Sequence, residues 1–508
     1  MFNHIESELK KQENLSQTEN GAFGYKTTES ALLDLNYSVS SLRNASEDEI
    51  TTLFLKAYTE NPEYALKWLF FARDIREGLG ERRLFRVCYK ELAYLDRPSF
   101  YGNLFEIPKY GRWDDLISLL GINDEIDENI ATFIYGQICV DIDHMNEGKP
   151  ISLLAKWMPS ENASSFKTKN LAKHLRKLLK VSSKEYRVTL STLRKYLDVV
   201  EVKMCDNKWE DIDYNKVPSL ANLKYKEAFL RHDSDRREAY LESVKSGDSK
   251  MNMSVATPVD IISRYTRFMN FGWHREVNQY DTTLELAWDN LKNISIKDTL
   301  VVADGSGSML DNVSKHTTAL DVANALAIYS SEHNSGVYRN KYITFSSNPQ
   351  FVDLTEADTL KGKLEIALNY CECSNTDIEK VFDLILEIAV RYNIPQDEMI
   401  KNVMIISDME FDHAQRWGAR TNILTKTLFE EIEDRYKDKG YHLPRLIFWN
   451  VNSRTGTIPV TTNELGVALV SGFSQNVLKM VMNNNYDPYQ VLIETLDNKR
   501  YNRIKYYE

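Results

Sequence analysis

Cysteine is scarce and scattered in this sequence. Five of the 508 residues are cysteines: Cys88, Cys139, Cys205, Cys371 and Cys373. An odd number without regular spacing excludes the disulfide framework of small secreted domains, and no second pair or nearby histidine completes a zinc site around the C-x-C stretch. Reduced thiols are typical of proteins inside cells, so we expect a cytoplasmic location.

Long apolar runs are missing as well. No stretch approaches the ~20 apolar residues that a membrane-spanning helix requires. The N-terminal stretch MFNHIESELKKQENLSQTENG is polar and lacks the apolar core of a signal peptide. We therefore expect no membrane partner.

Common catalytic signatures are absent too. The sequence has no Walker A motif, no H-E-x-x-H, no G-x-S-x-G and no plausible Cys–His pair. Glu410 and Asp412 lie just beyond Asp408 and could bind a second ion or act as bases in a metal-dependent hydrolase. A two-metal site needs bridging carboxylates, however, and the serine-rich surroundings offer too few. We predict that the protein is not an enzyme.

Positive charge is concentrated in one region. The net charge of −11 argues against non-specific nucleic-acid binding by the whole surface. Residues 166–195 nevertheless contain ten Lys or Arg and one acidic residue, whereas the other 478 residues carry 53 basic and 73 acidic side chains. A solvated face explains such a run about as well as a polyanion site does. The candidate nucleic-acid contacts are Lys167, Lys169, Lys173, Arg176, Lys177, Lys180, Arg187, Arg194 and Lys195.

The first part of the chain has helical periodicity. Residues 1–20 are polar, and we expect them to form a flexible tail. Over residues 21–297 apolar side chains recur at three- and four-residue spacing, and prolines and glycines stand at the expected helix ends. Successive helices with short loops predict an all-α domain of HEAT-like helical repeats, arranged as a solenoid or a ring.

Residues 298–508 alternate between apolar strands and helices instead. Strands that are apolar throughout, each followed by a helix, form a parallel sheet covered on both faces. The sequence thus predicts a multidomain fold, an all-α region followed by a doubly wound α/β domain. The predicted strands are 299–304, 340–346, 351–354, 402–407, 445–451 and 466–471.

The first of these strands ends in the motif D-x-S-x-S. In TLVVADGSGSM, which starts at position 299, a buried run delivers Asp304 to the sheet edge, where open α/β sheets bind ligands. Ser306 and Ser308 follow, separated by glycines that let the loop turn tightly. One carboxylate and two hydroxyls suit a hard divalent cation such as Mg²⁺ or Mn²⁺.

Two later residues could complete that ligand set. Thr376 lies in a polar loop before a helix, and Asp408 ends a second buried run. With Asp304, Ser306 and Ser308 they resemble the metal-ion-dependent adhesion site of von Willebrand factor A domains. The resemblance implies one bound divalent ion with a free coordination position for a partner's carboxylate. Helix capping by the two aspartates is the alternative explanation.

Short motifs occur along the whole chain. Those in the helical part are ENGA at 19–22, RDIREG at 73–78, GRWDDL at 111–116, AKWMP at 155–159, VPS at 217–219 and RHD at 231–233. Those in the sheet part are DGSGSM at 304–309, FDLIL at 382–386, SDMEFD at 407–412 and FWN at 448–450. Together they resemble the DUF2828 family of uncharacterised proteins, over roughly residues 19 to 480. One departure from the usual pattern of a metal-ion-dependent adhesion site is Gly305, where such sites more often carry Val, Ile or Thr.

The order of domains, helical and then A-like, is similar to that of Ro ribonucleoproteins. In those proteins a ring of helical repeats, the TROVE domain, binds small structured RNAs. The similarity implies a non-enzymatic RNA-binding scaffold with a metal-dependent site for an acidic protein partner, and no sequence-specific DNA binding. The alternative is an adaptor or assembly factor that acts through the metal site alone, without nucleic acid; a metal-dependent hydrolase ranks below both.

Overall fold

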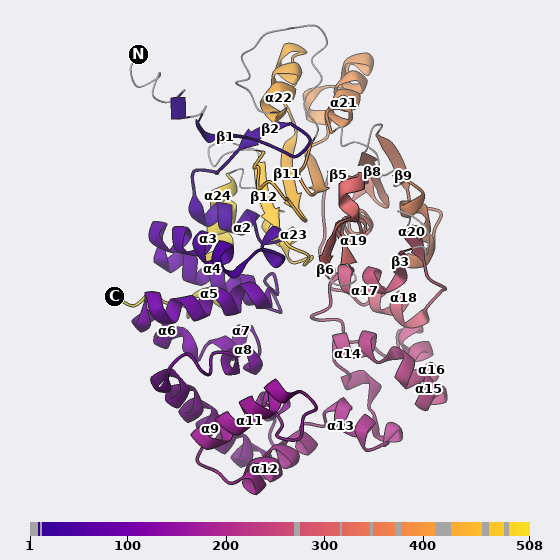
Figure 1. Cartoon of the computed structure of the whole chain (residues 1–508). Helices are drawn as coiled ribbons and strands as arrows, with labels where there is room; N and C mark the ends of the chain where they lie inside the picture. The colour runs from indigo at the N-terminus through magenta and orange to yellow at the C-terminus, as the bar shows by residue number, and fades with distance from the viewer. Residues whose placement is uncertain are drawn as a thin grey trace. The chain divides into compact units, whose positions relative to one another are not determined.

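The chain folds into two units. The structure, a computed structural model, describes residues 9–10, 13–268, 275–314, 317–345, 349–370, 378–411, 428–459, 467–481 and 487–508. One unit, here called the sheet unit, comprises residues 1–68 and 256–500, and the other, the helical unit, comprises residues 69–255 and 501–508. Helix α4 (Pro62–Arg73) carries the chain from the first into the second. Figure 1 shows the elements by label.

A six-stranded sheet forms the centre of the sheet unit. Its strand order is β12-β11-β10-β5-β8-β9, and every neighbouring pair is parallel except β8 and β9. β5 is buried at all six positions, as its unbroken apolar sequence requires of a strand covered on both faces. The strands are β5 (Thr299–Asp304), β8 (Lys341–Phe345), β9 (Gln350–Asp353), β10 (Asn402–Ser407), β11 (Arg445–Asn450) and β12 (Val467–Ser471).

This order places a topological switch point between β5 and β10. From β5 the chain moves to β8 and β9 on one side, and from β10 it moves to β11 and β12 on the other. Right-handed crossovers in opposite directions put their helices on opposite faces, and open α/β sheets usually bind their ligands outside the strand ends at such a point. The doubly wound α/β fold predicted from the sequence is confirmed.

Helices cover both faces of the sheet. α19 (Ala319–Glu332) packs on β5, β8 and β10, and all but its last residue are buried. Phe429 of α22 (Leu428–Asp438) meets Phe448 of β11 and Phe382 of α21 edge-on. The other helices of this unit include α2 (Ala31–Tyr37), α3 (Glu47–Glu60), α17 (Pro258–Tyr265), α18 (Thr282–Asp289), α20 (Leu360–Asn369), α21 (Glu379–Tyr392), α23 (Val477–Val481) and α24 (Pro488–Leu496).

The N-terminal residues belong to this unit, which the sequence does not predict. β1 (Leu15–Gln17) pairs with β2 (Phe23–Tyr25), and Tyr25 exchanges two main-chain hydrogen bonds with Ile458 at 2.7 and 2.8 Å. A Cβ on Gly24 would lie 2.6 Å from the carbonyl oxygen of Ile458, so only glycine permits this approach. Residues 15–17 of the expected flexible tail thus form a strand. A polar strand held by main-chain bonds leaves little hydrophobic signal in the sequence.

The predicted boundary at residue 298 differs from the division by packing. Residues 256–297 and 1–68 pack with the sheet, although both stretches are mainly helical. Periodicity reports where helices give way to strands, and it does not report which helices cover the sheet. Two further strand pairs were also not predicted: β3 (Thr266–Phe268) with β4 (Arg275–Val277), and β6 (Asn312–Ser314) with β7 (Thr317–Thr318).

The regular elements described in the helical unit are all helices, which agrees with the predicted helical character of the N-terminal region. Among the described residues, no helix is both long and apolar enough to cross a membrane. The unit contains α5 (Arg82–Leu95), α6 (Arg97–Leu104), α7 (Ile107–Tyr110), α8 (Trp113–Ile117), α9 (Asp124–Asn146), α10 (Leu154–Trp157), α11 (Phe166–Leu178), α12 (Ser183–Tyr196), α13 (Val200–Cys205), α14 (Ser219–Lys224), α15 (Lys226–His232) and α16 (Ser234–Lys245).

A buried ion pair explains two of the charged stretches in this unit. Arg73, from RDIREG, lies 2.7 Å from Asp115, from GRWDDL, and their side chains are 1% and 0% exposed. Asp115 also accepts a bond from Arg86 Nε at 2.7 Å. A Cβ on Gly111 would lie 2.5 Å from Asp115 Oδ2, so the glycine of the motif makes room for the pair.

Removing one partner of this pair should be costly. We expect Asp115→Asn to lower the free energy of unfolding by about 3–5 kcal/mol, because the Arg73 guanidinium would stay buried without a counter-charge. Asp114→Asn, a matched change in a neighbour that is 25% exposed, should cost about 1 kcal/mol or less. Urea denaturation of both variants measures the difference, and equal losses would contradict this account.

Candidate metal centre and basic helical face

Asp304 and Asp408 come together at the switch point. Asp304 is the last residue of β5, and Asp408 follows the last residue of the neighbouring strand β10. Their exposures are 1% and 0%, although carboxylates are rarely fully buried. Parallel pairing of the two strands places both carboxyl ends at one edge of the sheet, as the sequence predicts.

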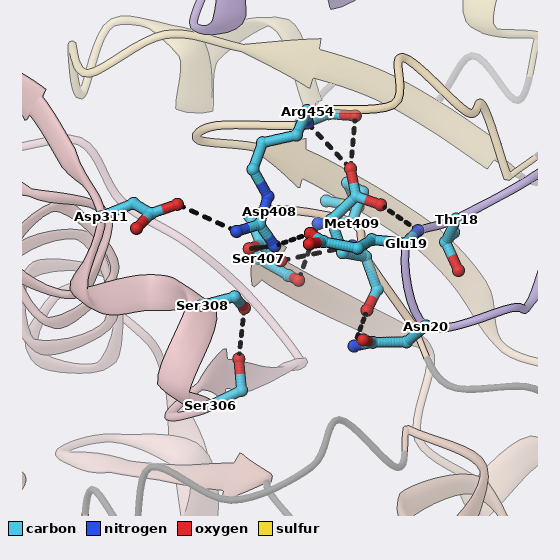
Figure 2. A network of polar contacts seen from close by, with 12 residues as sticks. Thr18, Glu19, Asn20, Ser306, Ser308, Asp311, Ser407, Asp408, Met409 and Arg454 are labelled. Atoms are coloured by element: carbon cyan, nitrogen blue, oxygen red, sulfur yellow. Dashed lines mark hydrogen bonds and ion pairs between the residues drawn. The ribbon is translucent and has the colours of Figure 1, made fainter.

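The loop after β5 brings its two serine hydroxyls together. Ser306 donates its main-chain N–H to Asp304 Oδ1 at 2.8 Å, which turns the chain back over the carboxylate. The Ser306 and Ser308 hydroxyl oxygens lie 2.9 Å apart, as Figure 2 shows. A short 3₁₀ helix, Gly307–Leu310, begins between them. One carboxylate and two hydroxyls thus share the loop, as expected from the spacing.

Ser407 is a further member of the site that the sequence analysis missed. It ends β10, it is fully buried, and its hydroxyl donates to Asp304 Oδ2 at 2.6 Å and accepts from Met409 N at 2.9 Å. Met409 has a φ of 63°, a left-handed conformation that an L-residue with a long side chain adopts rarely. A serine closing an otherwise apolar strand was the signal available in the sequence.

The two carboxylates carry more negative charge than their surroundings balance. Burial raises the pKa of Asp304, and burial together with the nearby charge of Asp304 raises the pKa of Asp408. The guanidinium of Arg454 is 3.4 Å from Asp408 and lies beyond strong hydrogen-bond distance. The pair is therefore costly when both groups are ionised, and a cation between them would remove that cost.

The donor chemistry fits a hard divalent cation. Carboxylate and hydroxyl oxygens are the ligands that Mg²⁺ and Mn²⁺ prefer. Within the described ranges no three His, Cys, Asp or Glu side chains cluster as metal ligands, so a cation here would need hydroxyl, main-chain or water oxygens as well. Thr376, the fifth predicted ligand, lies outside the described residues.

Glu410 has a structural role. It is fully buried, and its Oε1 accepts the main-chain N–H groups of Arg454 and Thr455 at 2.8 and 2.9 Å, while its Oε2 accepts that of Glu19 at 2.8 Å. A carboxylate committed to three main-chain donors lacks the free lone pairs of a second metal ligand or a general base. Asp412, the other residue considered for that role, lies outside the described residues.

Arg454 connects the candidate metal centre to two more carboxylates. Its Nη1 lies 2.9 Å from Asp311, and its Nη2 lies 2.7 Å from Glu19 and 3.4 Å from Asp408. Figure 2 shows the guanidinium extended between these groups. No sequence pattern connects Arg454 with Glu19, because residues more than 400 positions apart give no spacing signal.

The predicted nucleic-acid contacts lie on or directly after α11 and α12, which both pack on α9 (Figure 1). Three of the nine donate to protein oxygens: the exposed Arg187 to the Ser183 carbonyl oxygen at 3.1 Å, and the half-buried Arg176 and Arg194 to groups farther away in the sequence. Arg176 Nε pairs with Glu161 at 2.9 Å. Arg194 donates to the carbonyl oxygens of Ala155 and Met158 at 2.8 and 2.7 Å, and burial lowers its pKa. These two arginines hold the helices in place.

The other seven cations form no ion pair with the described residues. We call them the basic face: Lys167, Lys169, Lys173, Lys177, Lys180, Arg187 and Lys195. All but the half-buried Lys169 are exposed. Phe166, at the start of α11, is 78% exposed beside them. Positive charge with an exposed aromatic ring suits an anionic partner that can also stack.

Two family models match the chain, one over the N-terminal region and the other over the C-terminal region. Residues 18–121 and 167–299 match "Domain of unknown function (DUF2828)". Two stretches of the N-terminal region are therefore similar to the DUF2828 family. Residues 298–503 match "Domain of unknown function (DUF7788)", which spans the sheet strands and both aspartates of the candidate metal centre. The resemblance to DUF2828 predicted from sequence motifs is confirmed for the N-terminal region.

Similar proteins span most of the chain. The uncharacterized protein L728 of Acanthamoeba polyphaga mimivirus is 29% identical over 524 residues, which cover 95% of this chain and 87% of that protein. Among solved structures, the Ro (RSR) protein of Deinococcus radiodurans aligns with 87% of this chain and 91% of its own, at 14% identity and a TM-score of 0.35.

Proposed function

We propose that this chain is a non-enzymatic binding protein whose sheet unit holds one divalent cation, Mg²⁺ or Mn²⁺, for coordination by a partner's carboxylate. The observation that supports it most is the pair of buried carboxylates, Asp304 and Asp408, at the switch point of the sheet. Structural carboxylates are seldom buried side by side without a full counter-charge. Ser306 and Ser308 add hydroxyl donors on the same loop.

The geometry supports binding over catalysis. Besides Asp408, the described part of the SDMEFD stretch has one carboxylate, that of Glu410. Its oxygens already accept three main-chain hydrogen bonds. One cation held by two carboxylates and hydroxyls leaves a coordination position for an outside ligand, and within the described part of the SDMEFD stretch Glu410 is not free to act as a base. A metal-dependent adhesion site, as the A-domain resemblance implies, needs no more than this.

Metal binding should stabilise the fold. We expect saturating Mg²⁺ or Mn²⁺ to raise Tm, since a ligand that binds only the folded state adds about 2.7 kcal/mol at a hundred times its Kd. Asp304→Ala should abolish the metal-dependent increase. Differential scanning fluorimetry with EDTA and with each metal tests this, and an unchanged Tm for the natural protein at millimolar metal would refute the proposal.

A second proposed activity is binding of structured RNA by the basic face. It is supported by seven clustered cations that the described carboxylates leave unneutralised, in a chain whose net charge is −11. Electrostatic contacts of this kind predict affinity that falls steeply with salt and depends little on sequence. An adaptor that acts through the metal alone is the alternative, and it would bind its partner equally well in nuclease-treated extract.

A further inference from the structure

The N-terminal segment Thr18–Asn20 lies directly on the residues that follow Asp408. Thr18 Oγ1 donates to the carbonyl oxygen of Phe411 at 2.6 Å, and Asn20 Nδ2 donates to that of Glu410 at 2.7 Å. Between them, the main-chain N–H of Glu19 donates to Glu410 Oε2 at 2.8 Å. Three consecutive residues are therefore fixed on the stretch that leads away from the candidate metal centre.

This anchoring points the Glu19 carboxylate at the metal-site edge. Its Oε2 lies 2.7 Å from Arg454 Nη2, the same nitrogen that lies 3.4 Å from Asp408 Oδ2 (Figure 2). One guanidinium nitrogen thus separates an acidic side chain of the chain's own N-terminal segment from a candidate metal ligand. The Glu19 side chain is 56% exposed and that of Arg454 is 31% exposed, so solvent and other carboxylates can reach both.

The charges around Arg454 make this position selective for a carboxylate. A divalent cation at Asp304 and Asp408 would add positive charge next to the guanidinium, and the two cations together attract an anion strongly. Glu19 is already there, and its tether gives it a high effective concentration, of about millimolar or more. A free carboxylate must displace it.

We propose that Thr18–Asn20 is a built-in competitor of the metal-dependent ligand, with Glu19 in the place of a partner's carboxylate beside Arg454. This inference rests on the proposed metal-dependent function and deepens it. It also defines the partner. The ligand is an acidic side chain on an extended peptide, because the peptide must replace both the Glu19 carboxylate and the main-chain contacts to Glu410. Binding of the partner is therefore coupled to release of the N-terminal segment from Glu410 and Arg454.

The test uses the full chain loaded with Mn²⁺ and a single blocked glutamate, N-acetylglutamate amide, as the probe. Bound Mn²⁺ broadens the NMR signals of a probe that exchanges onto it, so titration gives the probe's Kd. Glu19→Gln removes the competing charge, and Asn20→Ala weakens the anchor without changing any charge. Glu13→Gln is the matched control, since it removes a carboxylate from an exposed residue that precedes the segment.

We expect Glu19→Gln to lower the Kd of the probe at least about fivefold and Asn20→Ala to lower it by a smaller factor, as loss of a tethered competitor requires. Glu13→Gln should leave it unchanged. If Mn²⁺ binds but both site variants match the natural protein, or bind the probe more weakly, Glu19 is only a surface ion pair and the inference is overturned while the proposed function stands. If calorimetry shows no Mn²⁺ binding to the natural chain, both fall.

Discussion

Asp408→Asn is expected to abolish metal binding and, at the same time, to stabilise the metal-free protein. The first effect follows from the loss of one of two charged ligands, and we expect Mn²⁺ affinity to fall about 100-fold or more. The second follows from burial. Asp408 is fully buried beside Asp304, so its ionised form destabilises the folded state whenever no cation is bound.

The stabilising effect of Asp408→Asn should depend on pH. The pKa of Asp408 is raised in the folded state above its ordinary value of 3.8. Its contribution to stability is therefore fully present below pH 3.8 and is lost as the pH rises through the folded-state pKa. The variant should exceed the natural protein by about 1–3 kcal/mol at pH 7.5 in EDTA, and the difference should shrink in acid.

Urea denaturation at several pH values and calorimetry with Mn²⁺ measure the two effects. The matched control is Asp311→Asn, which removes another carboxylate bound to Arg454 but one that is 54% exposed. Its stability should change by less than about 0.5 kcal/mol. Destabilisation of metal-free Asp408→Asn at pH 7.5 would show that Asp408 caps or supports the loop instead of holding a cation.

The second large effect concerns the basic face. Charge reversal of Lys173, Lys177 and Lys180 to glutamate should weaken binding of a hairpin RNA about 100- to 1,000-fold at 50 mM salt. The slope of log affinity against log salt should fall by about two to three, since each lysine releases roughly one counterion. Fluorescence anisotropy of labelled RNA with the full chain measures both quantities.

A matched triple reversal in the same unit is the control. Lys216, Lys245 and Lys250 are also exposed, and the first two lie within 4.0 Å of the carboxylates of Asp213 and Glu242. Reversing them changes the net charge by the same amount away from the basic face. If both triples weaken RNA binding equally, general charge and not this surface attracts RNA. If the natural chain binds no hairpin RNA even at 50 mM salt, the basic face is a solvated surface.

The sequence by itself determined the sheet and half of the site. Apolar β-branched runs fixed the strands within a residue or two, because a strand buried on both faces leaves no polar positions. The same runs placed Asp304 and Asp408 at strand ends, and parallel pairing then required them to meet. Ser306 and Ser308 followed from local spacing alone.

Only the tertiary structure decided what surrounds those residues. Ser407 bonds to Asp304 because the register of the two strands places them next to each other. Arg454 and Glu19 lie on loops far apart in the sequence, and no periodic pattern connects them. Arg176 and Arg194 belong to the same charge run, but the structure shows them bonded to protein groups. The sequence of a charge run does not show which of its cations have acceptors within the protein. Short segments of sequence determine which donor groups lie close together on one loop. Contacts between residues hundreds of positions apart, such as Glu19 and Arg454, depend on how the whole chain packs.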